Sequence, residues 1–179
     1  MKLLVVSDSH GDIRYLARAL KRFVGMVDLI AHLGDGSDDL WPAAEAAGVR
    51  LPRTEAVRGN CDGGDPGLWP RRLIGTSEKP ILLLHGHSEG ASEGMGRIVD
   101  AAQQSGAKLV LFGHTHRIFM EEYRGVIALN PGSISRPRDR SRPSFAVVDA
   151  PEEPDTWFDV KFYEVGAGSG RVREIFPLE

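Results

Sequence analysis

Five of the six histidines in this chain lie in three short motifs, and each motif follows an apolar run. The motifs are Ser7-Asp8-Ser9-His10, His85-Gly86-His87 and Gly113-His114-Thr115-His116. A single histidine is more often a structural residue than a ligand. Grouped imidazoles at the ends of apolar runs point instead to a functional site, because imidazole binds metals and exchanges protons near neutral pH.

Carboxylate and amide side chains occupy the same position, in a turn after a strand-like segment, in two further motifs. They stand in Leu33-Gly34-Asp35 and in Arg58-Gly59-Asn60-Cys61-Asp62. In an open α/β sheet, ligands bind outside the carboxyl ends of the strands, where side chains distant in sequence converge. We therefore expect one site built from seven side chains: Asp8, His10, Asp35, Asn60, His85, His114 and His116.

This donor set combines imidazole nitrogens with hard oxygens, which suits divalent first-row metal ions better than a thiolate site would. Seven donors exceed the four ligands of a tetrahedral zinc, and they match two ions that share a carboxylate and keep positions open for water and substrate. A structural zinc site is the weaker alternative, because such sites are usually rich in cysteine and the chain has one cysteine. The sequence predicts a two-metal catalytic site.

Local backbone freedom is needed if both members of Asp8/His10 and of His114/His116 are to reach the same site, because alternate residues share a face only in a regular strand. Glycine is adjacent to most of the donors. We expect these glycines to take a positive φ or to let the backbone approach the metals closely. They are Gly11, Gly34, Gly59, Gly86 and Gly113.

The elements that must position the donors alternate between strand-like and helix-like patterns in the first part of the chain. Strands are predicted over residues 2–6, 28–33, 55–58, 71–77, 80–84 and 108–112. Helices are predicted over 13–23, 40–47 and 95–104. The segments 118–123, 126–129, 144–149, 157–164 and 171–176 read as strands without helices between them, which predicts an α/β fold whose second half is antiparallel.

The length of 179 residues and the 41% hydrophobic content fit one domain over residues 1–179 and exclude a disordered or fibrous chain. Apolar runs fall well short of the roughly 20 residues that a membrane helix needs, and no secretory signal pattern is present. A single cysteine, Cys61, agrees with a reducing compartment, so we expect a cytoplasmic protein. The net charge of −3 provides no global field for nucleic acid, which makes nucleic acid an unfavoured partner.

Two loops are strongly charged. Residues 136–142 hold four arginines and one aspartate, whereas residues 152–155 hold three acids. Both are read first as solvated loops, with recognition of a second phosphate by Arg136 as an alternative. Asp38 and Asp39 are read as helix-capping acids rather than ligands.

The ordered motifs Asp8-x-His10, Gly34-Asp35, Gly59-Asn60, His85-Gly86-His87 and Gly113-His114-x-His116 closely resemble those of the calcineurin-like metallophosphoesterase superfamily. The string Gly59-Asn60-Cys61-Asp62 and the turn Asn130-Pro131-Gly132-Ser133 are similar to those of its small YfcE-type phosphodiesterases. The resemblance covers residues 3–149. It implies a four-layer αββα sandwich, with two mixed β-sheets flanked by helices, and places the Asn130 turn beside the metals.

The resemblance also implies a role for each donor. Asp8, His10 and His116 would hold one metal ion, Asn60, His85 and His114 would hold the second, and Asp35 would bridge them. The expected cofactors are two divalent ions, with manganese favoured and nickel, zinc, iron and magnesium as alternatives. Asn60, Asp35 and His87 are the expected catalytic residues, and His87 is open between ligand, ligand support and substrate contact.

The expected reaction is hydrolysis of small phosphodiesters or nucleotides, in which a metal-bridging hydroxide attacks phosphorus and the two ions clamp the attacking and leaving oxygens. Cys61 departs from the pattern of many superfamily phosphatases, which have a histidine there. A thiol is a weak donor with an ordinary pKa near 8.5, so diesters and aryl leaving groups should be cleaved better than alkyl monoesters. The structural reading of Cys61 is a small buried packing residue.

Two other functions compete with this prediction. One is a catalytically weak, metal-binding scaffold for a protein partner, as in the retromer subunit that resembles this family. A nuclease is the other, and it would need a basic channel that the composition does not suggest. Edge strands in the second half also leave a homo-oligomer open.

Overall fold

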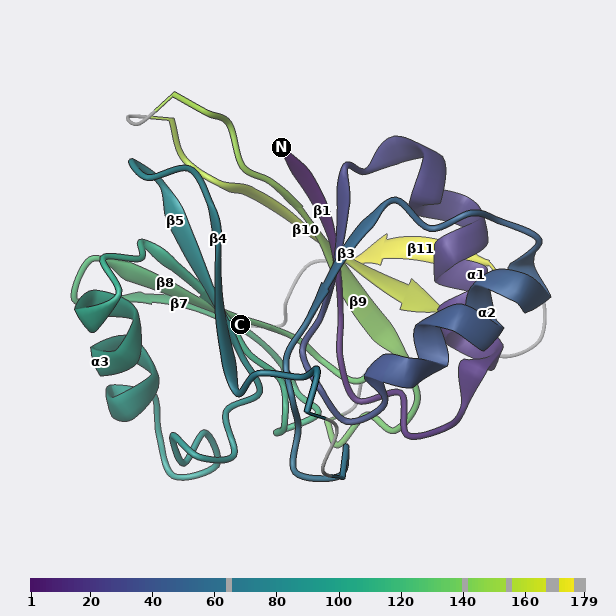
Figure 1. Cartoon of the computed structure of the whole chain (residues 1–179), viewed down its shortest axis with the longest axis horizontal. Helices are drawn as coiled ribbons and strands as arrows, with labels where there is room; N and C mark the ends of the chain where they lie inside the picture. The colour runs from purple at the N-terminus through teal and green to yellow at the C-terminus, as the bar shows by residue number, and fades with distance from the viewer. Residues whose placement is uncertain (64–65, 140–141, 154–155, 167–170, 176–179) are drawn as a thin grey trace.

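Two β-sheets pack face to face between helices in the computed structural model of the chain (Figure 1). The structure describes residues 1–63, 66–139, 142–153, 156–166 and 171–175. The strands of one sheet are β1 Lys2–Val6, β2 Leu29–His32, β3 Arg53–Ala56, β9 Ser144–Asp149, β10 Asp159–Val165 and β11 Val172–Ile175. Those of the other are β4 Arg71–Gly75, β5 Pro80–Leu84, β6 Leu109–Leu111, β7 Ile118–Tyr123 and β8 Val126–Pro131.

Both sheets are mixed. The first has the order β11-β10-β9-β1-β2-β3, and the second has the order β4-β5-β6-β8-β7. Strands β1, β2 and β3 run parallel to one another, as do β5, β6 and β8. The remaining described pairings are antiparallel. Each sheet therefore contains a three-stranded parallel block whose carboxyl ends can carry functional loops.

Alternation along β1 shows how the sequence builds the layers. Leu3 and Val5 pack into the core between the sheets, whereas Leu4 and Val6 pack against the helices on the outer face. Successive side chains of a strand point to opposite faces, so a strand with both faces covered is apolar throughout. Buried strands β5 and β6 follow the same rule, and so does β2 except for its last residue, His32.

Helices close both outer faces. The helices α1 Ile13–Phe23 and α2 Leu40–Ala47 cover the six-stranded sheet, and α3 Gly96–Gln104 covers the five-stranded sheet (Figure 1). In α1, the N-cap Asp12 accepts a hydrogen bond from the amide of Arg14. Helix α2 ends at Gly48, whose φ of 66° is a typical C-terminal stop. The predicted four-layer α/β sandwich of two mixed sheets is confirmed.

Most predicted elements are confirmed, and their ends differ from the predicted ones by at most two residues. The expectation of an antiparallel second half is wrong for β8, which pairs parallel with β6 and antiparallel with β7. Strands β7 and β8 form a hairpin that joins the sheet through its second strand, β8. Strand β7 therefore lies at the edge, and β8 runs in the same direction as β6. Parts of three predicted segments, at residues 140–141, 154–155 and 176, lie outside the described residues.

Among the described residues, we find no helix with both the length and the apolar character needed to cross a membrane.

Candidate metal centre

The seven predicted donors follow the carboxyl ends of five parallel strands. Asp8 and His10 come after β1, Asp35 after β2 and Asn60 after β3. From the other sheet, His85 follows β5, and His114 and His116 follow β6. The two sheets thus contribute loops to one common edge of the sandwich, and the seven side chains meet there.

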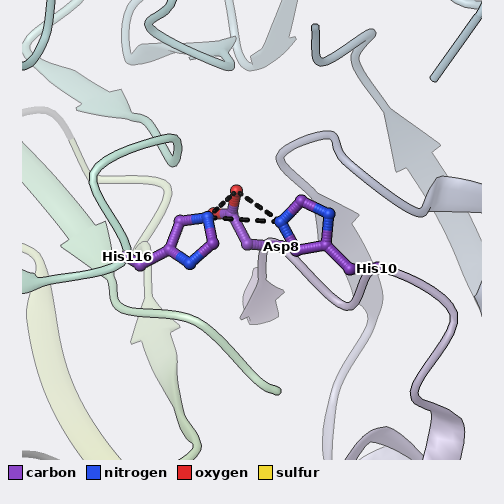
Figure 2. A group of neighbouring side chains, drawn as sticks. All are labelled: Asp8, His10 and His116. Carbon is purple, nitrogen blue, oxygen red and sulfur yellow. Dashed lines mark hydrogen bonds and ion pairs between the residues drawn. The ribbon is translucent and has the colours of Figure 1, made fainter. Parts of the chain in front are cut away.

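One group of donors consists of Asp8, His10 and His116, whose ring nitrogens and carboxylate face one another (Figure 2). The Nε2 atom of His116 lies 3.1 Å from Asp8 Oδ1 and 3.2 Å from His10 Nε2. His10 Nε2 lies 3.9 Å from Asp8 Oδ1. Donors held about 2.1 Å from one ion are roughly 3.0–3.4 Å apart, so these three atoms have nearly the spacing of ligands to a single cation.

A second group consists of Asn60, His85 and His114. Asn60 Oδ1 lies 3.2 Å from His85 Nε2 and 3.1 Å from His114 Nδ1. The rings of His85 and His114 meet edge to face, with centroids 5.3 Å apart. One oxygen and two imidazole nitrogens therefore converge in this group as well.

Asp35 lies between the two groups. Its Oδ2 atom is 3.8 Å from His10 Nε2 in the first group and 3.5 Å from His85 Nε2 in the second. Its other oxygen, Oδ1, accepts a 2.7 Å hydrogen bond from the amide of Cys61. One carboxylate is thus fixed by the backbone while the oxygen that both groups approach stays available.

Five of the seven donors hold a left-handed backbone, a conformation that non-glycine residues seldom adopt. The φ values lie between 47° and 68° for Asp8, His10, Asp35, His114 and His116. This is the turn geometry that lets both members of Asp8/His10 and of His114/His116 reach the site. Such strained residues persist only where the surrounding structure holds them, and they concentrate at functional sites.

Two glycines allow the loops to approach closely. A Cβ atom on Gly59 would lie 2.1 Å from Asp35 Oδ1, and one on Gly113 would lie 2.0 Å from Ser7 Oγ. Neither of these two glycines has a positive φ, whereas Gly11, Gly34 and Gly86 do. Both expected uses of glycine are therefore present at this edge.

Backbone carbonyls fix the orientation of two imidazoles. His85 Nδ1 donates a 2.6 Å hydrogen bond to the carbonyl oxygen of Leu33, and His116 Nδ1 donates one of 2.6 Å to that of Arg136. Donation from Nδ1 places the lone pair on Nε2, the atom that faces the centre. Metal-binding histidines are typically held by such contacts.

The electrostatics favour a cation. Burial alone would raise the pKa of Asp8, but His116, His85 and Ser7 together hold it below its ordinary value. The pKa of Asp35 is likewise lowered despite burial, chiefly by His85 and the amide of Cys61. Conversely, these carboxylates raise the pKa of His85 against the effect of its burial.

Asp8 Oδ1 provides a test of whether the donors fit a metal. This atom is buried and has no hydrogen-bond partner in the part of the chain that the structure describes. It is nonetheless 3.1 Å from His116 Nε2, without hydrogen-bond geometry. An unpartnered buried carboxylate oxygen is costly, and a divalent cation between these two atoms would satisfy both.

His87 stands at the rim of the second group. Its ring centroid is 5.3 Å from that of His85 and 6.2 Å from that of His114. Its buried Nδ1 atom has no hydrogen-bond partner among the described residues, and burial lowers its pKa. The structure thus places His87 beside the donors and outside both groups.

Three residues that support the site were not predicted to do so from the sequence. The carboxylate of Asp62 accepts hydrogen bonds from the amides of Asp35, Gly36 and Gly59. Ser133 and Ser135 both donate to the carbonyl oxygen of Asp8. Two signals were present: Asp62 stands in the Gly59–Asp62 string, and Ser133 stands in the Asn130 turn. The roles themselves could not be predicted, because side chains that hold backbone groups have no fixed sequence spacing from those groups.

Asp39 and Cys61 correct two structural expectations. Asp39 makes no side-chain cap of α2; instead, its carboxylate accepts hydrogen bonds from Ser9 Oγ and the amide of Gly11. It braces the loop that carries His10. Cys61 is exposed rather than buried, because its amide is directed to Asp35 and its side chain is left at the surface, where Asn60 Nδ2 approaches Sγ.

Two further loops adjoin the donors: the Asn130 turn, as the resemblance implied, and the loop of Arg136, which was read first as a solvated loop. Asn130 Nδ2 donates to the carbonyl oxygen of Gly113 and to Thr115 Oγ1, so the Asn130 turn supports the loop of His114 and His116. Arg136 approaches the carbonyl oxygen of His10 with its guanidinium, at 3.4 Å. This arrangement puts one arginine of the basic loop next to the metal-site loops.

Comparison with known proteins identifies the family of the chain. Residues 1–153 match the family model of the calcineurin-like phosphoesterase superfamily domain. The chain is 35% identical over 166 residues to the probable metallophosphoesterase YsnB of Bacillus subtilis, covering 92% of this chain and 91% of YsnB. It is 27% identical over 168 residues to the phosphodiesterase YfcE of Escherichia coli, covering 83% and 88% of the two chains.

A solved structure shares the fold. Vps29 of Entamoeba histolytica, determined in complex with Zn²⁺, superposes with a TM-score of 0.74 at 23% identity and covers 98% of both chains. At this identity the likeness concerns the fold alone. The family model and the identity to YsnB show more than the fold: this chain belongs to the calcineurin-like phosphoesterase superfamily.

Proposed function

We propose that this protein is a metal-dependent phosphodiesterase that hydrolyses small phosphodiesters or nucleotides at a dinuclear centre. The observation that carries the proposal is the convergence of six nitrogen and oxygen donors around Asp35, with the buried Asp8 Oδ1 left without a hydrogen-bond partner in the described chain. Relatives named metallophosphoesterase and phosphodiesterase support the same reaction class.

Each group of donors is assigned one divalent cation. Asp8, His10 and His116 would hold the first, and Asn60, His85 and His114 would hold the second. Asp35, within 4 Å of a histidine in each group, would be shared. We propose manganese for both positions. Nickel, zinc, iron and magnesium are alternatives, because this mixture of nitrogen and oxygen donors accepts all of these ions.

Divalent cations at such a centre lower the pKa of a bound water and stabilise charge on phosphoryl oxygens. The chain's own groups prepare this chemistry. Leu33 and Arg136 hold His85 and His116 in the orientation that presents Nε2. Asn60 is exposed at the centre, so its amide can contact a phosphoryl oxygen while its carbonyl oxygen faces His85.

His87 is proposed to contact the substrate. Its ring is only partly buried and adjoins His85 and His114. An imidazole in this position can donate to a phosphoryl oxygen or protonate a leaving group. Cys61, which is exposed beside Asn60, is a poorer proton donor. We therefore propose a preference for diesters and aryl leaving groups, whose departure needs less help from an acid.

The alternative function is a scaffold that binds metal and a protein partner, as the structural similarity to Vps29 suggests. The complete set of seven donors favours the enzyme, because a scaffold that only binds a partner has no need of a second metal position beside the first. We also propose that residues 1–179 form one cytoplasmic domain. Beyond the matched segment, β10 and β11 continue the sheet of β9, which supports a single unit.

The test is hydrolysis of a chromogenic phosphodiester and its matching monoester by protein stripped of metal and then supplied with manganese, nickel, zinc, iron or magnesium. The variants Asp35→Asn and His85→Ala serve as site controls, and Asp159→Asn changes an exposed acid away from the centre. Diester hydrolysis should return with metal in the wild type and in Asp159→Asn only. Absence of hydrolysis with every metal, in protein that binds two ions, would favour the scaffold.

A further inference from the structure

A basic cavity of about 950 Å³ lies between α1 and the end of the six-stranded sheet formed by β10 and β11. Six cationic side chains from four segments line it, together with one acid, Glu164. The cations are Arg18, Lys21, Arg22, Arg142, Arg171 and Arg173. These lining side chains carry a net charge of +5, although the whole chain carries −3.

This basic cavity is separate from the metal centre and contains none of its seven donors. Helix α1 begins three residues after His10, and its contributions to the cavity come from the second half of the helix. At 1.5 Å per residue, Arg22 lies about 14 Å along the helix axis from Ile13. Figure 1 shows α1 beside β11, on the side of the molecule away from α3.

Glu164, the single acid among the described lining residues, compensates only part of the positive charge of the cavity. Glu164 accepts a 3.1 Å hydrogen bond from Arg173 and one of 3.3 Å from the amide of Arg142. No ion pair joins Lys21, Arg22 or Arg171 to an acid within the residues that the structure describes. Arg18 donates to the carbonyl oxygen of Gly166, which holds its guanidinium against the rim.

Helix α1 accounts for only part of this arrangement. Lys21 and Arg22 lie in its last turn, where cations stabilise the helix dipole. That explanation does not apply to Arg142, Arg171 or Arg173, which come from the loop before β9, from the residue before β11 and from β11. Like charges brought together from four segments repel one another, and an anionic ligand would relieve the repulsion.

We propose that the basic cavity binds a small anion that carries two or more phosphates. Guanidinium groups form paired hydrogen bonds with phosphate oxygens, and five of the six cations are arginines. The volume lies within the range of small-molecule sites. A concave site of this size on a chain of net negative charge fits a compact polyphosphate better than a nucleic-acid strand or a membrane surface.

The proposal is tested by isothermal titration calorimetry of inorganic tripolyphosphate into full-length protein freed of metal on a chelating resin, at low ionic strength. Removal of metal prevents phosphate from binding through cations at the other site. The test variant is Arg22→Gln/Arg171→Gln. The matched control is Arg50→Gln/Lys108→Gln, which removes the same charge from two exposed positions outside the cavity.

We expect one tripolyphosphate per chain, with affinity about tenfold or more weaker in the test variant and changed less than about twofold in the control. Hydrolysis of the model diester by the metal-loaded test variant should equal that of wild type, so loss of binding is distinguished from failure of the catalytic proposal. The inference is overturned by no binding at millimolar tripolyphosphate or by equal weakening in both variants. Preferential binding of a single-stranded oligonucleotide or of phosphatidylserine vesicles through Arg22 and Arg171 would also overturn it.

Discussion

The carboxylate of Asp62 accepts a 2.8 Å hydrogen bond from the backbone amide of Asp35. Asp62 is not a proposed ligand, but it fixes the position of Asp35, which is proposed to bridge two ions. The same carboxylate accepts from Gly36 at 2.6 Å and from Gly59 at 2.7 Å. It thereby joins the loop after β2 to the loop after β3. The position of Asp35 is set by a neighbouring loop as well as by its own strand.

Replacement of Asp62 by alanine should therefore weaken the centre as well as the fold. We expect a loss of about 3 kcal/mol in the free energy of unfolding, because three amides lose a charged acceptor. Manganese affinity or diester turnover should fall by about 10- to 100-fold, as for other groups that orient metal ligands. Urea unfolding and metal titration measure these effects, with Asp159→Ala as control. Unchanged metal affinity in a folded Asp62→Ala protein would argue against this role.

Gly59→Ala should damage the same junction by steric conflict. The new Cβ atom would meet Asp35 Oδ1 at 2.1 Å and the amide nitrogen of Asp35 at 2.4 Å, so one of the loops must move. We expect destabilisation of about 1–3 kcal/mol and loss of most diester hydrolysis. Gly25→Ala is the matched control, because a Cβ there meets nothing within 4 Å. Equal activity of the two variants would refute the close-approach argument.

His32, the histidine outside the three motifs, predicts a dependence of stability on pH. Burial lowers the pKa of His32 to about 4 from an ordinary value of 6.5, and its ring contacts Ser9 Oγ and the amide of Gly34. Between pH 6.5 and 4 the unfolded chain binds a proton that the folded chain does not. The contribution of His32 to the free energy of unfolding is therefore complete above pH 6.5. About 3 kcal/mol of this contribution is lost as the pH falls from 6.5 toward 4.

Urea unfolding of metal-free protein across this pH range measures the effect. His32→Asn should be less stable at pH 7 and should lose less stability than wild type between pH 6.5 and 4. Parallel pH profiles for the two proteins would show that His32 does not titrate in this way. Comparison of the two profiles removes the shared contribution of the carboxylates.

Cys61 predicts a change in substrate preference. Partial desolvation and the neighbouring Asp35 carboxylate raise the pKa of the Cys61 thiol, so it remains a protonated, weak donor at neutral pH. Cys61→Ser should keep diester turnover within about threefold, whereas Cys61→His should raise turnover of an alkyl monophosphate by about tenfold or more. Steady-state kinetics on both substrates measure this. A monoester rate that is already comparable to the diester rate in wild type would contradict the prediction.

The sequence predicted the strands and donors whose signals are local. The apolar runs of β1, β2, β5 and β6 indicated strands, and most of the expected donors follow such a run closely. Apolar spacing over Ile13–Phe23 and the stop at Gly48 likewise specified α1 and the end of α2. These patterns depend on near neighbours in the chain, so they can be read without a structure.

Features that depend on distant pairing were not predicted. The parallel direction of β8 follows from which strand of its hairpin meets β6, and no residue of β8 encodes that choice. In the sequence, Asp62 looks like an ordinary acidic residue of a turn. Its role depends on the amides of Asp35 and Gly36, which belong to the loop after another strand. The basic cavity is hidden for the same reason, because Arg22 and Arg171 are 149 positions apart.

Two ions sharing Asp35 are the central claim, and counting bound manganese by equilibrium dialysis with metal analysis tests it most directly. Wild type should bind two ions per chain. Asp8→Asn should lose the ion assigned to His10 and His116, Asn60→Ala should lose the other, and Asp35→Asn should weaken both. Binding of one ion or none by wild type, or an equal loss in Asp8→Asn and in the exposed control Asp159→Asn, would contradict the dinuclear account.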